Sequence, residues 1–223
     1  QLVLPRYTDY ATNTDLFAIS KKSIIPTHKE TQAQPEHWIT VFVHGIKSIK
    51  PHVSLDNFLR FMHDDVEDTV YSRTVELMRA DAHFFQNQPM QQVGFHKIDT
   101  LSTARPGNAS HAMAVLFDET SRLSGNNEIN TYYTYGWSGL LSPSMRYKES
   151  IPLLLELEKE VKNYRALGIN PKIRFIGYSH GGNVCLNVAK GYEELFPNCS
   201  LVINQLIMVG SPEQGETDYL VNS

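Results

Sequence analysis

The sequence predicts an α/β fold, with helices on both faces of a predominantly parallel β-sheet. Three observations lead to this prediction. Short runs rich in β-branched and aromatic residues alternate with longer amphipathic segments. The run at 38–43 is nearly continuously apolar, as expected of a strand buried on both faces of a parallel sheet. The 223 residues, of which 41% are hydrophobic, suffice for a single large domain, and no internal boundary is evident.

The strands are expected where apolar runs are bounded by turn residues. The strands predicted to be central in the sheet are 38–43, 131–135, 172–177 and 204–209. From the order of apolar strands and amphipathic helices, the strand at 172–177 should have a neighbour on each side. Weaker candidates at the sheet edge are 2–4 and 16–19.

Helices are expected where apolar residues recur every three or four positions. This periodicity predicts a helix over 55–85 and another after the strand at 172–177, ending before Pro197. Between them, Ser150 resembles an N-cap, with Pro152 in the first helical turn and Gly168 closing the helix. Residues 86–130 fit no single element, although 109–123 is a helical candidate. So long a connection is typical of a lid or a binding insertion.

The candidate chemistry centres on Gly177-Tyr178-Ser179-His180-Gly181, which lies between a predicted strand and a predicted helix. Gly-x-Ser-x-Gly in that position is the nucleophile elbow. The turn is tight enough to strain the serine backbone, and bulk two positions on either side would collide with the neighbouring strand and helix. The elbow raises the Ser179 hydroxyl above the sheet and places the His180 N–H at a helix N-terminus, as an oxyanion donor.

Two further loops follow predicted core strands and are expected near the same edge of the sheet. His44-Gly45-Ile46 follows the strand at 38–43. Its alternative interpretation is a simple glycine turn beside a core histidine. Trp137 and Leu140 follow the strand at 131–135, where strand ends border the ligand crevice of an α/β sheet. These two side chains are expected either to line an apolar acyl pocket or to pack in the core beneath a loop.

Composition excludes several other functions. The formal net charge is −4 and the basic residues are scattered, which argues against nucleic-acid binding. No apolar run has the length of a transmembrane helix, so a soluble protein is expected, cytoplasmic or secreted. The two cysteines, Cys185 and Cys199, provide neither a metal site nor a disulfide framework, and no cofactor is predicted.

The order of these features resembles the α/β-hydrolase superfamily. His-Gly at 44–45 follows one core strand, and Gly-x-Ser-x-Gly at 177–181 follows another. The run from Gly210 to Asp218 is similar to the Thr-Pro-x-x-Gly-Ser segment of bacterial lipases, with Ser211 in place of the threonine. The resemblance extends over 38–218.

The resemblance implies a lipase-like or esterase-like serine hydrolase that acts on carboxylic esters through an acyl-enzyme on Ser179. It implies an oxyanion hole formed by the backbone N–H groups of Ile46 and His180. Asp218 is a possible acid, and its alternative interpretation is an ordinary loop residue. The residues expected around an ester or lipid-like substrate are His44, Gly45, Tyr178, Trp137 and Leu140.

The chain departs from this family at the catalytic histidine. In the family the acid and the histidine follow the serine, but the only histidine after Ser179 is its neighbour His180, whose side chain diverges from the hydroxyl. The strands expected after 209 are absent as well. In one interpretation the chain is part of a longer or cleaved hydrolase, and a C-terminal segment or second chain completes the sheet and the triad.

Two other interpretations remain. An earlier histidine such as His96 or His111 is recruited as the base, or the domain is a non-catalytic relative that serves as a binding or interaction module. The first interpretation predicts that these 223 residues alone are essentially inactive and prone to associate, because the serine lacks a base and the last strand has an unpaired edge.

Overall fold

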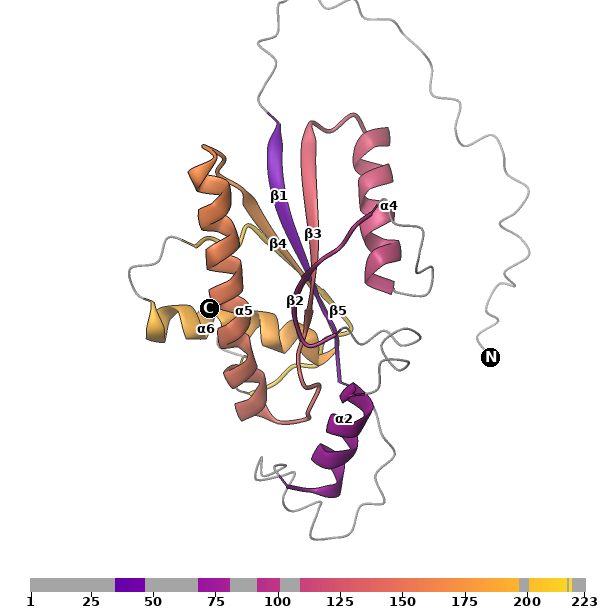
Figure 1. Ribbon diagram of the computed structural model, residues 1–223, viewed down its shortest axis with the longest axis vertical. Helices are drawn as coiled ribbons and strands as arrows, with labels where there is room; N and C mark the ends of the chain where they lie inside the picture. The colour runs from indigo at the N-terminus through magenta and orange to yellow at the C-terminus, as the bar shows by residue number, and fades with distance from the viewer. Residues whose placement is uncertain are drawn as a thin grey trace, which may run out of the picture. The chain divides into compact units, whose positions relative to one another are not determined.

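A five-stranded, mostly parallel β-sheet organises the described part of the chain (Figure 1). The computed structural model describes residues 35–46, 68–80, 92–100, 109–196, 201–215 and 217. The strands are β1 (Glu36–Val43), β2 (Gly94–Lys97), β3 (Glu128–Gly136), β4 (Lys172–Tyr178) and β5 (Gln205–Val209). The helices are α2 (Val70–Ala80), α4 (Ala109–Leu123), α5 (Pro143–Ala166) and α6 (His180–Leu195). The predicted α/β class with a predominantly parallel sheet is therefore confirmed.

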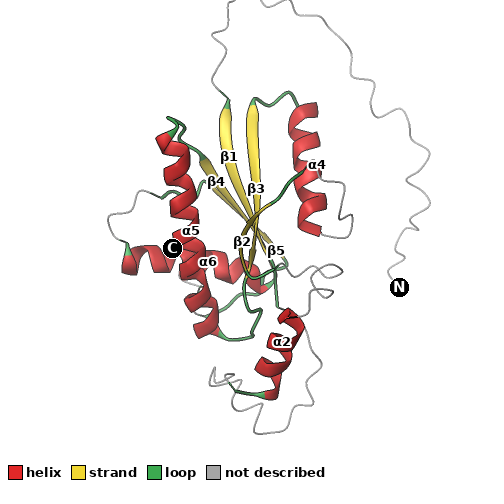
Figure 2. Ribbon diagram, in the orientation of Figure 1, coloured by secondary structure: helices red, strands yellow, loops and turns green. Residues whose placement is uncertain are grey.

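The strand order β2-β3-β1-β4-β5 reverses direction at β1. From β1 the chain passes to β2 at one end of this order and comes back to β3, beside β1; it then crosses β1 to form β4. Only β2 is antiparallel to its neighbour. Because parallel crossovers are right-handed, this reversal places the crossover helices on opposite faces. Figure 2 shows α4 on one side of the strands and α5 with α6 on the other. The carboxyl ends of β1 and β4 thus form a topological switch point.

Side-chain alternation along β1 divides the core between the two faces. Ile39, Val41 and Val43 are buried in the larger cluster, which includes leucines of α5 and Val184 of α6. Phe42 belongs to the smaller cluster, which includes Ala114 of α4. Since successive side chains of a strand point to opposite faces, the continuous apolar run in β1 serves both layers.

The predicted neighbours of the serine-bearing strand are confirmed, but β5 differs from its prediction. β4 pairs with β1 on one side and with β5 on the other. Within the described residues β5 pairs only with β4, so it is an edge strand and not a central one. Leu206, Met208 and Val209 are accordingly 37%, 41% and 44% exposed. An isolated apolar run does not reveal whether a second neighbour is present.

Other predictions fall partly outside the described residues. Of the helix predicted over 55–85, the structure describes Val70–Ala80 as α2. Asp68, with φ 59, and Thr69 are not helical, so the prediction of one continuous helix over this range is wrong. The insertion at 86–130 contains β2, α4 and the start of β3. The edge candidates 2–4 and 16–19 lie outside the described residues. No helix among the described ranges is both long enough and apolar enough to cross a membrane.

The prediction that Ser150 caps the helix before β4 is wrong. The helix, α5, begins at Pro143, where Ser142 is the N-cap and its Oγ accepts a hydrogen bond of 3.1 Å from the Met145 N–H. Ser150 is buried inside the helix, and Pro152 lies in its interior. Proline interrupts a helix locally, but burial of Leu153 and its neighbours against the sheet maintains α5 through that point.

The predicted end of the same helix is confirmed. Gly168 has φ +77, and its N–H donates to the Arg165 carbonyl, while the Ile169 N–H donates to the Tyr164 carbonyl. These two bonds define a Schellman ending, in which the left-handed residue is usually glycine.

Gly168→Ala should lower the free energy of unfolding by about 1–2 kcal/mol, because a Cβ disfavours the left-handed conformation. A Cβ at Gly168 has no atom within 4 Å, so the effect isolates backbone strain from packing. Gly215→Ala is the matched control, since that site is equally open and lacks a positive φ. Urea denaturation measures both variants, and equal stabilities would contradict the assigned cap.

Candidate active site

Ser179 occupies a strained turn between β4 and α6. Its backbone has φ 51 and ψ −132, and Asp68 is the only other non-glycine residue with positive φ among those described. The turn is held by two backbone hydrogen bonds, from the Ser179 N–H to the Val209 carbonyl (2.9 Å) and from the Gly182 N–H to the Ser179 carbonyl (3.0 Å). Such a conformation costs on the order of 1–3 kcal/mol and persists only where surrounding structure enforces it.

The glycines on either side allow the close packing that enforces this turn. A Cβ on Gly177 would lie 2.5 Å from the Gly182 Cα. A Cβ on Gly181 would lie 2.3 Å from the Val43 carbonyl oxygen and 2.5 Å from that of His44. Real Cβ atoms do not approach so closely, and backbone atoms cannot move aside as a flexible side chain can. The steric role predicted for both glycines is thus confirmed.

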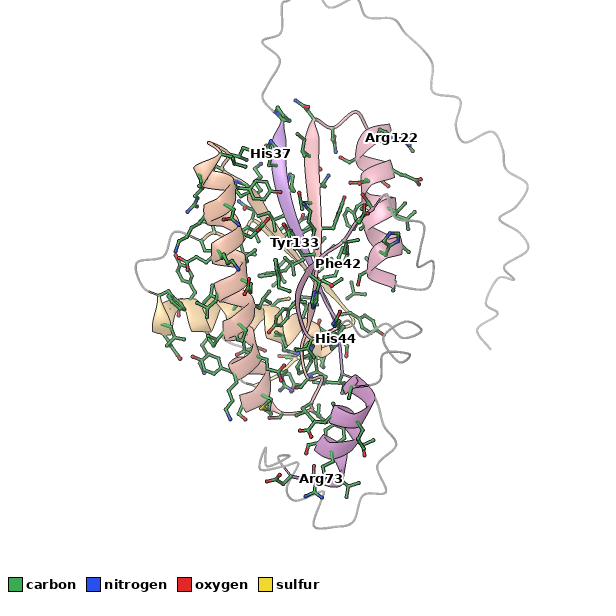
Figure 3. All side chains as sticks on the ribbon, in the orientation of Figure 1. His37, Phe42, His44, Arg73, Arg122 and Tyr133 are labelled. Carbon is green, nitrogen blue, oxygen red and sulfur yellow. The ribbon has the colours of Figure 1, made fainter. Side chains whose placement is uncertain are left out.

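The loop after β1 lies directly against Ser179. A Cβ on Gly45 would be 2.7 Å from the Ser179 Cβ and 3.3 Å from its Oγ. His44 Nδ1 lies 2.6 Å from the Gly45 carbonyl oxygen, and His44 Nε2 accepts a hydrogen bond of 3.1 Å from the Trp137 N–H. Figure 3 shows His44 at the carboxyl end of β1, next to Phe42. The parallel register of β1 with β4 brings this loop to the elbow.

An apolar cavity of about 260 Å³ adjoins the elbow. Its walls come from the end of β1, the first turns of α4, and the ends of β4 and β5. The lining residues are Phe42, Val43, His44, Gly45, Ile46, Ala109, Ser110, Met113, Ile176, Tyr178 and Val209. His44, Gly45, Ile46 and Tyr178, all expected at the site, thus border one cavity.

Trp137 and Leu140 do not line that cavity. Trp137 is fully buried and stacks on the His44 ring, with centroids 5.8 Å apart. Leu140 is buried in a small cluster with Val75 of α2. In place of Trp137 and Leu140, the cavity wall includes the α4 residues Ala109, Ser110 and Met113. The sequence analysis did not predict these three residues at the site. The amphipathic period of 109–123 identifies a helix but not the cavity over which it packs.

The described histidines differ in their surroundings. Figure 3 shows His37 at the opposite end of β1 from His44. The Nε2 atoms of His96 and His111 lie 2.8 Å and 3.0 Å from the backbone carbonyl oxygens of Val93 and Asp99. The Ser179 hydroxyl has no hydrogen-bond partner within the described part of the chain. The recruitment of His96 or His111 therefore gains no support from a contact with the serine.

The loop after β5 is attached to α6 by buried polar groups. The Thr217 hydroxyl donates to Asn183 Oδ1 (2.8 Å), and Asn183 Nδ2 donates to the Pro212 carbonyl (3.2 Å). Asn183 and Thr217 are each 1% exposed. The candidate acid Asp218 follows immediately but lies outside the described residues.

Cys185 is a second nucleophilic side chain close to the elbow in sequence, but it lies in the core. It is buried in α6 within the main hydrophobic cluster. Burial raises the pKa of its thiol far above the usual range, so the thiol stays protonated and unreactive.

Comparisons of the chain with protein-family models, with curated proteins and with solved structures gave no match. The resemblance to the α/β-hydrolases therefore stays a prediction from the sequence motifs.

Ser179→Gly should raise the free energy of unfolding by about 1 kcal/mol relative to Ser179→Ala. Relief of about 1–3 kcal/mol of strain exceeds the roughly 0.5–1 kcal/mol entropic cost that glycine adds. Both variants lack the hydroxyl, so their difference measured by urea denaturation reports only the backbone. An alanine variant at least as stable as the glycine variant would show that the turn is unstrained.

Gly181→Ala should destabilise the protein by about 3 kcal/mol or more, because the added methyl meets two backbone carbonyls. Gly191→Ala is the matched control in the same helix. Its Cβ would lie 2.5 Å from Ile151 Cδ1, the end of a side chain that can rotate. Improved helix propensity of about 1 kcal/mol should nearly offset that rearrangement. Thermal and urea unfolding provide the comparison, and equal losses would refute the assigned contact.

Proposed function

We infer that the chain is a serine hydrolase of carboxylic esters, with Ser179 as its nucleophile. The observation that supports this most strongly is the serine at φ 51 and ψ −132, held between β4 and α6 at the switch point of the sheet. Strained residues concentrate at functional sites, and ligands of α/β sheets bind at switch points. Gly45 and the apolar cavity lie beside the serine.

The proposed reaction proceeds in two steps. Ser179 Oγ bonds to the ester carbonyl carbon while its proton passes to a general base, and the alcohol then leaves with that proton. Water hydrolyses the acyl-enzyme by the same route. The N–H groups of His180, at the start of α6, and of Ile46, after Gly45, are proposed to stabilise the tetrahedral oxyanion. The proposal assigns the base and the acid to groups outside the described residues.

The cavity favours a small apolar acyl group. Its volume of about 260 Å³ is below the roughly 300–1,000 Å³ of sites for drug-sized ligands. Phe42, Met113 and Ile176 contribute apolar walls, so the acyl chain gains from burial while the ester remains beside the serine. A short-chain ester is therefore the proposed substrate, and a long lipid chain fits this cavity less well.

A non-catalytic binding module is the second candidate. The observation that favours it is the Ser179 hydroxyl, which no described residue contacts by a hydrogen bond. Without a base a serine keeps its proton near neutral pH and is a poor nucleophile. The same cavity then binds an apolar group without cleaving it.

The intact natural protein should be labelled by a fluorophosphonate probe at Ser179 and should hydrolyse p-nitrophenyl butyrate. Ser179→Ala should abolish the labelling and lower turnover by several orders of magnitude, because the nucleophile is lost. Ser211→Ala is the matched control and should retain both activities; its hydroxyl is buried and also lies near the start of α6.

The outcomes separate the two candidates. Labelling that persists after Ser179→Ala would identify another nucleophile. Absence of labelling and of turnover in the intact natural protein, together with butyrate binding that Met113→Trp weakens, would support the binding module. Met113 lines the cavity from α4, so a larger side chain there fills the space without replacing the serine.

A further inference from the structure

Trp137 and His44 connect the ends of two neighbouring strands. β1 and β3 are parallel, with Val43 opposite Tyr135, so the residues that follow them emerge side by side. Trp137 is 0% exposed, and its ring stacks on that of His44 at an interplanar angle of 17°. A buried tryptophan normally finds a partner for its indole N–H. Here that partner is the His44 carbonyl, at 2.6 Å.

The second hydrogen bond from Trp137 determines the His44 tautomer. The Trp137 backbone N–H donates to His44 Nε2, at 3.1 Å. Nε2 therefore presents a lone pair, and in the neutral ring the proton resides on Nδ1. Nδ1 lies 2.6 Å from the Gly45 carbonyl oxygen, to which its N–H can donate.

The direction of the Gly45 carbonyl determines that of the next N–H. The described chain contains no cis peptide bonds, and in a trans peptide the carbonyl and the following N–H point in opposite directions. The His44 ring attracts the Gly45 carbonyl and so turns the Ile46 N–H away from the ring. This peptide belongs to the loop that lies against Ser179.

We propose that Trp137 is a positioning residue, which acts through His44 to fix the Gly45–Ile46 peptide with the Ile46 N–H directed to the reacting centre. The assignment of that N–H as an oxyanion donor rests on the proposed function, whereas the arrangement of Trp137, His44 and Gly45 does not. Flipping the peptide would present a carbonyl oxygen instead, and an oxyanion would be repelled. The Trp137 indole and the His44 imidazole thus orient the Ile46 N–H without forming a hydrogen bond to it.

The first test measures the tautomer of His44 and does not require the protein to hydrolyse esters. Long-range proton–nitrogen NMR spectra of the full chain labelled with nitrogen-15 should show His44 as the neutral Nδ1–H tautomer. The signal is assigned by its loss in His44→Phe. Trp137→Phe removes the indole N–H that holds the His44 carbonyl but keeps the backbone N–H that donates to His44 Nε2, so it should preserve the Nδ1–H tautomer while shifting the Ile46 amide resonance. A wild-type His44 protonated at Nε2 would overturn the inference whether or not the protein hydrolyses esters.

Steady-state kinetics of the intact natural protein give the second test. His44→Phe keeps a stacking ring without ring nitrogens and should lower kcat at least about tenfold, towards the 10²–10³-fold cost of losing one oxyanion donor, with little change in KM. His44→Asn places an amide where Nδ1 was and should recover much of that loss. His44→Gln, whose amide overlaps Nε2, should not.

Controls distinguish this role from general core packing. Tyr133→Phe removes one hydrogen bond, to Glu160, from another aromatic side chain of the same cluster, and it should leave kcat unchanged. Circular dichroism and thermal unfolding select variants that remain folded. If the tautomer is Nδ1–H but the folded His44→Phe enzyme retains wild-type kcat, the positioning role is overturned while the hydrolase proposal stands. A wild-type protein with this tautomer but without esterase activity supports the tautomer lock and rejects the hydrolase.

Discussion

The close approach of the first turn of α6 to the end of β1 is the contact on which the site depends. Gly181 brings the helix backbone against the carbonyls of Val43 and His44, where no Cβ fits. The approach is possible only because β1 and β4 are adjacent and parallel. Ser179 must then turn sharply between β4 and α6, and it adopts a backbone conformation that a free serine avoids.

The same contact supplies the chemical features of the site. It positions the N-terminus of α6, with its partial positive charge, beside the loop that follows β1. Gly45 lies against the serine side chain, and the cavity extends from this loop to the first turns of α4. Backbone N–H groups, a hydroxyl and an apolar recess thus meet where the strand order reverses. This combination is suited to stabilising negative charge that develops next to an apolar group.

Two kinds of interaction hold the loops around the site. The loop after β1 is fixed by stacking and hydrogen bonding between His44 and Trp137. The loop after β5 is fixed through Asn183, which binds both Thr217 and the Pro212 carbonyl. Buried polar groups of this kind are costly unless they are satisfied, so each network allows few arrangements of its loop. The rigidity of the two loops therefore comes from the buried contacts of His44 and Asn183. Tyr178, at the rim of the site, remains 58% exposed.

The sequence alone determined the strands around the elbow, the two close-packed glycines and the helix end at Gly168. Each of these follows from short-range sterics or from alternation along one segment. Tertiary structure decided what depends on distant residues. Ser142 and Ser150 are both plausible caps beside a proline, and burial of α5 against the sheet favours the earlier one. Trp137 contacts His44, and Met113 borders the cavity, because chain crossovers bring together residues that are far apart in sequence.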